Sequence, residues 1–251
     1  MTSIILRGCN GKMGQVITEM VEADENAVIV AGIDIAQNRN NKYPVYQSFA
    51  ACNVKADVII DFSAPVNLEE MLEYAIKHKT AIVLCTTGFG KEQVVLIDEA
   101  ARQIPILRSA NMSMGINLIS KLIQQAAVIL ADAGFDIEIV ERHHNKKVDA
   151  PSGTALALAE AMNEVLNNEY SYKLDRSAER MARSRKEIGI SAVRGGTIVG
   201  EHEIVFAGTD EVIEIKHTAY SKAIFAKGAV QAAKYLPGKP AGMYSMSDMM
   251  Q

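Results

Sequence analysis

The sequence has few cysteines, no long hydrophobic run and no excess of positive charge. Among its 251 residues are three cysteines, Cys9, Cys52 and Cys85, whose wide separation predicts neither a disulfide framework nor a thiolate metal site. No apolar stretch reaches the ~18 residues of a membrane span without a charge, and the N-terminus lacks the features of a signal peptide. We therefore expect a reducing, cytoplasmic location and no membrane partner.

The formal net charge of −4 argues against nucleic acid as a partner. The length allows one large domain or two small ones, with a sizeable core. Strand-like and helix-like segments alternate in the first half, which predicts an α/β fold with a parallel sheet. The predicted strands span residues 3–7, 27–33, 56–62, 81–85 and 104–107, and predicted helices follow residue 14 and span 66–78 and 91–103.

A glycine-rich turn joins the first predicted strand to the first predicted helix. Gly8, Gly11 and Gly14 occupy the turn, and Asp34 follows the second strand, 20 residues beyond Gly14. Glycines let the backbone approach a pyrophosphate, the helix N-terminus attracts its charge, and a carboxylate at this distance accepts a hydrogen bond from a ribose 2′-hydroxyl. The layout predicts dinucleotide binding. The alternative is a structural turn in another α/β protein.

The residues after the second strand bear on the choice of nicotinamide cofactor. The Asp34 carboxylate suits a 2′-hydroxyl and would repel the 2′-phosphate of NADPH. Ile35 follows where an arginine would favour NADPH, although Arg39 and Lys42 are near in sequence. We expect NADH to serve at least as well as NADPH.

The second half predicts a different arrangement, in which consecutive strands form an antiparallel or mixed sheet packed on two helices. One open face of that sheet is a candidate oligomer interface, and the last helix is expected to return to the first sheet. The predicted helices span residues 115–133, 154–166 and 222–235, and the strands 135–140, 188–193, 197–206 and 211–217. Residues 167–186 are predicted to be an exposed polar excursion, and residues 237–251 show no clear element.

Residues 141–155, between a predicted strand and a predicted helix, are rich in ionisable and polar side chains. Five of the six residues 142–147 are basic or can become so, and Pro-Ser-Gly-Thr at 151–154 is a helix-start signal. A helix N-terminus beside cations favours a small, multiply charged anion. A solvated basic loop is the alternative.

Together, a nicotinamide domain and an anion site predict hydride transfer to a small carboxylated acceptor. Carboxylates would bind at residues 152–154, and the accompanying proton would come from His143, His144 or Lys147. Alternatively, the two adjacent histidines, His143 and His144, could bind a zinc ion. Adjacent residues of an extended chain point to opposite sides, and no third ligand has a familiar spacing, so we predict no metal site.

Several motifs carry a family resemblance. The longest comprises Glu141, His143, His144, Lys147, Asp149, Pro151, Ser152, Gly153, Thr154 and Ala155, and others lie at 8–14, 61–63, 86–89, 111–117 and 194–202. These motifs cover nearly the whole chain. They closely resemble the signature of the 4-hydroxy-tetrahydrodipicolinate reductase (dihydrodipicolinate reductase) family.

The resemblance implies NAD(P)H-dependent reduction of 4-hydroxy-tetrahydrodipicolinate, through its dehydrated cyclic imine, in the diaminopimelate route to lysine. It implies a Rossmann domain of residues 1–113 and 221–251 and a substrate-binding and oligomerisation domain of residues 114–220. It also implies a homotetramer built by pairing the second sheets.

The resemblance further implies the roles of individual residues. His143 and Lys147 resemble the proton donors, and His144, Gly153 and Thr154 the substrate-carboxylate contacts, beside Ser152 of the cap. The implied cofactor contacts are Gly8, Cys9, Asn10, Gly11, Lys12, Met13, Asp34, Cys85, Thr86, Thr87, Ser109, Ala110, Asn111 and Met112. Cys85 and Met112 depart from the family's usual glycine and phenylalanine.

Two other functions compete with the reductase. Another amino-acid-pathway dehydrogenase would explain the first 110 or so residues but not the spacing from Lys147 to Thr154. A non-catalytic NAD-binding sensor would bind the dinucleotide tightly without turnover.

Overall fold

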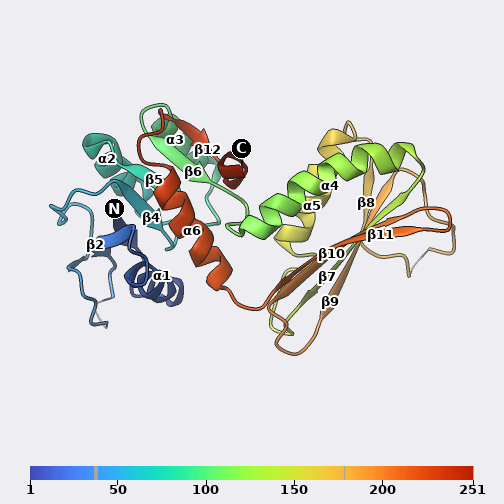
Figure 1. Cartoon of the computed structure of the whole chain (residues 1–251), viewed down its shortest axis with the longest axis horizontal. Helices are drawn as coiled ribbons and strands as arrows, with labels where there is room; N and C mark the ends of the chain where they lie inside the picture. Colours follow the sequence, from blue (N-terminus) through green and yellow to red (C-terminus); the bar gives the residue numbers. More distant parts are fainter. Residues whose placement is uncertain (37–38, 178, 251) are drawn as a thin grey trace. The chain divides into compact units, whose positions relative to one another are not determined.

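The computed structural model describes residues 1–36, 39–177 and 179–250. The chain divides into two compact units (Figure 1). The first unit combines Met1–Ser113 with Ala223–Gln251, and the second unit is the segment Met114–Lys222 between them. The second unit is thus an insertion, and the C-terminal segment belongs with the N-terminal sheet.

A parallel sheet forms the centre of the first unit. Strands β4 (Val58–Asp61) and β5 (Ala81–Leu84) are buried along their whole length, as apolar strands are when both faces of a parallel sheet are covered. This confirms the predicted α/β class. Within the described residues the spatial order is β12 (Gly242–Tyr244), β6 (Pro105–Arg108), β5, β4, β1 (Thr2–Arg7), β2 (Ala27–Ile33) and β3 (Val45–Tyr46).

Helices cover this sheet, and the last of them closes it. Helix α6 packs against α1 and against β4 and β5, which confirms that a C-terminal helix completes the Rossmann-like sheet (Figure 1). A side chain at Gly228 would place its Cβ 1.7 Å from the Met112 carbonyl oxygen, so only glycine allows this approach. The helices are α1 (Lys12–Glu22), α2 (Leu68–His78), α3 (Lys91–Ala101) and α6 (Ala223–Tyr235).

The prediction of no clear element after residue 237 is wrong. Strand β12 pairs in parallel with β6, with Met243 opposite Ile106, and a short 3₁₀ helix, η1 (Met246–Met250), follows. A three-residue edge strand has too little periodicity to be read from sequence. It forms because β6 offers unpaired backbone groups at the edge of the sheet.

The second unit is built on a mixed sheet, as predicted. Strand β7 is parallel to β9 and antiparallel to β10, and helices α4 (Met114–Asp132) and α5 (Gly153–Val165) pack on each other and on β7. Within the described residues the order is β11 (Val212–Ala219), β10 (Gly200–Ala207), β7 (Asp136–His143), β9 (Glu187–Arg194) and β8 (Ser171–Lys173).

Helix α4 is the one helix of the described residues that is long and apolar enough, by length and composition, to cross a membrane. The core helix of a globular unit passes the same test. Ile119, Ile123 and Ala127 of α4 pack with Leu158 and Met162 of α5 in the core of the second unit. These buried residues of α4 therefore belong to the core of the second unit, while Leu118, Leu122, Val128 and Ile129 of the same helix are exposed.

Two of the differences from the sequence prediction concern β7 and the polar excursion. Strand β7 continues to His143 rather than ending at Val140, because its residues pair with β9 as far as Arg194. The polar excursion contains β8, which pairs with the start of β9. The first difference matters for function, since Glu141, Arg142 and His143 sit on a strand rather than in a loop.

Candidate active site

The turn between β1 and α1 has steric reasons for its glycines. Gly8 has φ +80, and a Cβ there would lie 2.4 Å from the Phe62 carbonyl oxygen. A Cβ on Gly14 would lie 2.2 Å from the Gly8 carbonyl oxygen. Gly11 precedes the first residue of α1. The turn thus has no room for a side chain at Gly8 or Gly14, and it leaves the helix N-terminus at the sheet's carboxyl edge.

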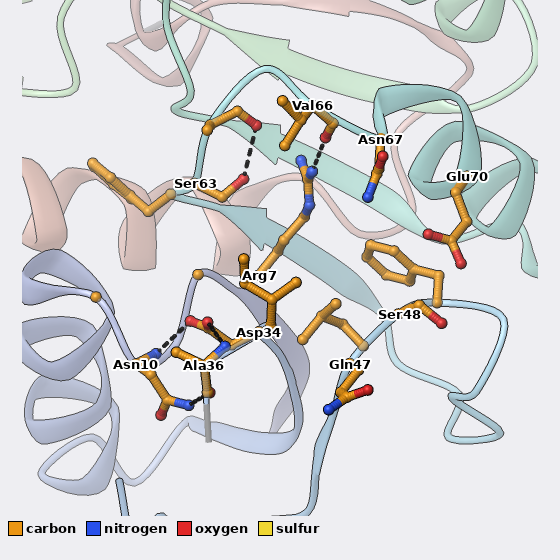
Figure 2. Close-up of a pocket in the computed structure, with 17 residues that line it drawn as sticks. Arg7, Asn10, Asp34, Ala36, Gln47, Ser48, Ser63, Val66, Asn67 and Glu70 are labelled. Carbon is orange, nitrogen blue, oxygen red and sulfur yellow. Dashed lines mark hydrogen bonds between the residues drawn. The ribbon is translucent and has the colours of Figure 1, made fainter. Parts of the chain in front are cut away.

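Asp34 lies beside this turn, at the end of β2. One carboxylate oxygen accepts a hydrogen bond from the Asn10 backbone N–H (2.9 Å) and the other accepts one from the Ala36 N–H (2.9 Å) (Figure 2). The Asn10 side chain also donates to the Ala36 carbonyl. These bonds tie the glycine turn to the loop after β2 and fix the orientation of the carboxylate.

A cavity of about 390 Å³ opens beside Asp34 and the turn. Ile33, Phe49 and Phe62 contribute apolar surface to it. An apolar cavity with a few fixed polar groups suits a small-molecule or cofactor moiety. The turn, the cavity and the carboxylate together fit the nucleoside and pyrophosphate of a dinucleotide.

Arg7 is the only cation among the described residues that line this cavity. Its guanidinium donates to Asp61 (3.2 Å). It also donates to the Val66 carbonyl, the bond that Figure 2 shows. Burial raises the pKa of Asp61, an effect that the Arg7 charge opposes. Arg7 is therefore committed to an internal ion pair.

A second hollow of about 380 Å³ lies where β5 and β6 end, and Thr86, Thr87, Ser109 and Ala110 line it. The neighbouring predicted residues are more enclosed: Met112 is buried, and burial raises the pKa of the half-buried Cys85 thiol. The remaining predicted cofactor residues of α1 and the turn differ in exposure: Lys12 is exposed, Met13 is half-buried, and Cys9 is buried with its pKa raised to about 12 by desolvation.

In the second unit, strand alternation places Glu141 and His143 on the buried face of β7. Register adds two neighbours from other strands: Arg194 of β9 lies opposite His143, and His202 of β10 lies opposite Glu141. The motifs contained all four residues, but the sequence predicted a role for His143 alone.

Glu141 is fully buried and accepts four hydrogen bonds. Arg194 donates to both carboxylate oxygens (2.7 Å each), Ser152 N–H donates to Oε1 (2.9 Å), and His143 Nδ1 lies 2.6 Å from Oε2. Burial disfavours the ionised carboxyl, but the bonds from Arg194, His143 and Ser152 outweigh it and lower the pKa of Glu141. The carboxylate is ionised and its bonding capacity is filled.

His202 packs edge-on against the His143 ring, with ring centroids 5.2 Å apart. Its Nε2 lies 3.1 Å from the Ser152 hydroxyl. Burial, followed by the nearby His143, lowers the pKa of His202 to about 4. His202 is therefore a neutral neighbour near pH 7.

The loop after β7 brings the remaining basic residues beside this network. Lys147 is paired with Asp149 at 2.8 Å, and this hydrogen bond lowers the pKa of Asp149. His144 is half-buried, and its Nδ1 is buried with no hydrogen-bond partner among the described residues. Arg142 instead faces away from the core and pairs with Glu203 at 2.7 Å.

The start of α5 lies next in the chain. Ser152 is buried, and its hydroxyl caps the helix by accepting from the Ala155 N–H (3.2 Å). Gly153 is exposed, with open space where a side chain would be, and Thr154 is half-buried. The helix start thus offers Gly153 to a ligand, while both polar groups of Ser152 have partners inside the protein.

No group of three or more His, Cys, Asp or Glu side chains is placed to hold a metal ion in residues 1–36, 39–177 and 179–250. His143 is instead committed at Nδ1 to Glu141. The site therefore presents acid–base and anion-binding groups.

Family models match the chain in two consecutive segments. The model for "Dihydrodipicolinate reductase, N-terminus" matches residues 2–112, and that for "Dihydrodipicolinate reductase, C-terminus" matches residues 115–250. The 4-hydroxy-tetrahydrodipicolinate reductases of Clostridium novyi (strain NT) and Clostridium tetani (strain Massachusetts / E88) are each 46% identical to the chain. The alignments cover 100% of this chain and 99% and 97% of those relatives.

Solved structures agree with these matches. The dipicolinate-bound dihydrodipicolinate reductase from Paenisporosarcina sp. TG-14 has a TM-score of 0.84 and 25% identity, with 99% of each chain covered. A probable dehydrogenase from Thermotoga maritima shares the fold alone, with a TM-score of 0.58, 12% identity, and 98% of this chain and 92% of that chain covered.

The full-length matches favour the reductase over another dehydrogenase or a non-catalytic sensor. They also confirm the resemblance carried by the sequence motifs, because both halves of the chain match the same family. The chain therefore belongs to the dihydrodipicolinate reductase family, whose members are NAD(P)H-dependent oxidoreductases that reduce 4-hydroxy-tetrahydrodipicolinate in lysine and diaminopimelate biosynthesis.

Proposed function

We propose that the first unit holds the dinucleotide along the carboxyl edge of its sheet. The N-terminus of α1 attracts the pyrophosphate, and the fixed Asp34 carboxylate accepts from the ribose. When bound, the reduced nicotinamide supplies a hydride. The proposed contacts are Gly8, Cys9, Asn10, Gly11, Lys12, Met13, Asp34, Cys85, Thr86, Thr87, Ser109, Ala110, Asn111 and Met112.

We propose further that NADH serves at least as well as NADPH. A 2′-phosphate beside the Asp34 carboxylate would meet like charge, and Lys42 is already paired with Glu22 at 2.8 Å. Kinetic comparison of the two cofactors tests this through kcat/KM. A preference for NADPH of about 100-fold, equivalent to ~2.7 kcal/mol, would contradict it.

The second unit would bind a small dicarboxylate. Three features support this proposal: the helix start at Gly153 and Thr154, the cation Lys147, and the buried Nδ1 of His144, which has no partner among the described residues. The name of the Paenisporosarcina relative reports bound dipicolinate, a dicarboxylate of this kind. For Ser152 we propose support of the site rather than direct contact, since Glu141, Ala155 and His202 already bond to it.

His143 and Lys147 are the proposed proton donors. Addition of a hydride to the cyclic imine requires one proton, and an imidazolium or an ammonium supplies it at neutral pH. The ring of His143 is held at Nδ1 and keeps 11% of its side chain exposed, so its Nε2 is the nitrogen left for exchange. Asp149 restrains the Lys147 ammonium.

Removal of either proton donor tests this assignment. We expect His143→Ala and Lys147→Ala each to lower kcat by ~10²-fold or more, the usual contribution of general acid catalysis. The assay couples the protein to the synthase that makes its substrate and follows NADH oxidation. NADH affinity should stay almost unchanged, because the proposed cofactor residues lie in the first unit. If the unmodified protein oxidised neither NADH nor NADPH in this assay, the proposed reductase function itself would be rejected.

A homotetramer in the cytoplasm completes the proposal. The second sheet exposes Val193 and Val212, and Tyr220 is exposed directly after β11; pairing of such apolar surfaces between copies would bury them. Sedimentation of a monomer at micromolar concentration would contradict this assembly. Free thiols at Cys9 and Cys52 suit a reducing compartment.

A further inference from the structure

We propose that Glu141, itself held by Arg194, is the positioning residue that fixes the tautomer and orientation of His143 for proton transfer. This inference rests on the proposed role of His143. Glu141 touches the catalytic ring from within the fold, and its four bonds leave no free position for the substrate. It is therefore a positioning residue and not a catalytic one.

The geometry of the strand creates the pair. Glu141 and His143 are two residues apart on β7, so they share one face, and Nδ1 meets Oε2 at 2.6 Å. An ionised carboxylate only accepts hydrogen bonds, so the hydrogen must sit on Nδ1. Neutral His143 then presents the lone pair of Nε2, and protonated His143 presents an Nε2–H that it can donate.

Arg194 stabilises the ionised Glu141 carboxylate inside the protein. A buried carboxylate without a counter-charge is strongly disfavoured, and the two Arg194 bonds of 2.7 Å supply that charge. The guanidinium also balances the attraction of Glu141 for the imidazolium. The pair therefore orients the ring without holding its proton as tightly as an unpaired carboxylate would.

The remaining neighbours hold the ring from other directions. His202 of β10 packs its edge against it and is neutral near pH 7. A Cβ at Gly200 would lie 3.1 Å from Nε2, so glycine keeps that side of the ring uncrowded. Lys146, Lys147 and Asp149 are the charged residues of the adjoining loop, and His217 lies opposite His202 on β11.

Glu141→Gln gives a specific prediction. Oε1 receives two obligate donors, Ser152 N–H and Arg194 Nη2, whereas Oε2 receives one, Arg194 Nη1, so the amide oxygen of the glutamine favours the Oε1 position. The amide NH₂ then faces His143 and makes Nδ1 an acceptor. Neutral His143 should switch from the Nδ1–H to the Nε2–H tautomer.

The test is ¹⁵N NMR of the histidine side chains in the substrate-free protein. The sequence has only five histidines, and a His143→Gln variant assigns the signal. We expect Nδ1–H in the unmodified protein and Nε2–H in Glu141→Gln, with kcat lowered by ~10²-fold or more.

The matched control is Glu203→Gln. Glu203 also pairs with an arginine, Arg142 at 2.7 Å, but on the other face of the same sheet. The control should leave the His143 tautomer and kcat unchanged.

An Nε2–H tautomer in the unmodified protein would overturn the inference even if Glu141→Gln failed to fold. An unchanged tautomer in a folded Glu141→Gln would overturn it as well. A switched tautomer with full activity would support the orientation of the ring by Glu141 and reject the role of His143 in proton transfer.

Discussion

Replacement of Arg194 by alanine should destabilise the second unit in a way that depends on pH. Glu141 would lose two charge-assisted bonds of 2.7 Å while staying fully buried. Breaking a buried ion pair by removing one partner costs ~3–5 kcal/mol, because the remaining charge is uncompensated. We expect a loss of this size at pH 7.

The sign of the pH dependence follows from the pKa of Glu141. Although burial opposes ionisation, Arg194, His143 and Ser152 lower the pKa in the folded protein. The ionised Glu141 carboxylate therefore contributes to stability above its unfolded pKa of about 4.3. This contribution is lost as the pH falls through the lower pKa of the folded protein. Without Arg194, burial should dominate and raise the folded pKa, so the variant loses stability as the pH rises through that value. The difference between the two proteins should shrink between pH 7 and about pH 4.

Hydrogen exchange of the β7 and β9 amides in increasing urea measures the stability of this unit separately from the first. Arg142→Ala is the matched control, because Arg142 is partly exposed and pairs with Glu203 on the other face. An exposed pair contributes ~0–1 kcal/mol. A loss below ~1 kcal/mol for Arg194→Ala, or a loss that does not change with pH, would refute the reasoning.

Two other predictions concern ligand binding. Thr154→Val should raise KM for the substrate by about 10- to 100-fold with kcat nearly unchanged, since a hydrogen bond to a charged group contributes ~1.5–3 kcal/mol; a lower kcat at the same KM would contradict that role. Gly8→Ala should weaken NADH binding by more than ~10-fold by calorimetry, because a Cβ there would lie 2.4 Å from the Phe62 carbonyl oxygen at φ +80. Gly90→Ala, with φ −71 and Gln93 as its nearest neighbour at 4.0 Å, should bind NADH normally.

Local pattern was enough to predict much of this protein. The apolar runs and glycine turn before Asp34 predicted a strand, a helix and a second strand, and they form β1, α1 and β2. The helix-start signal at residues 151–154 predicted α5, which begins at Gly153. These features depend on neighbouring residues, whose periodicity and backbone preferences the sequence states directly.

Tertiary structure decided what surrounds the proposed proton donor. Arg194 is 53 residues from Glu141, and His202 is 50 residues from Ser152. No periodicity connects such residues, because their meeting depends on which strands pair and in which register. The edge strand β12 has the same origin, since it exists through pairing with β6. The sequence by itself determined the elements, the turn and the types of reactive group, whereas strand order and register determined that Glu141 is buried, paired with Arg194 and aligned with His143.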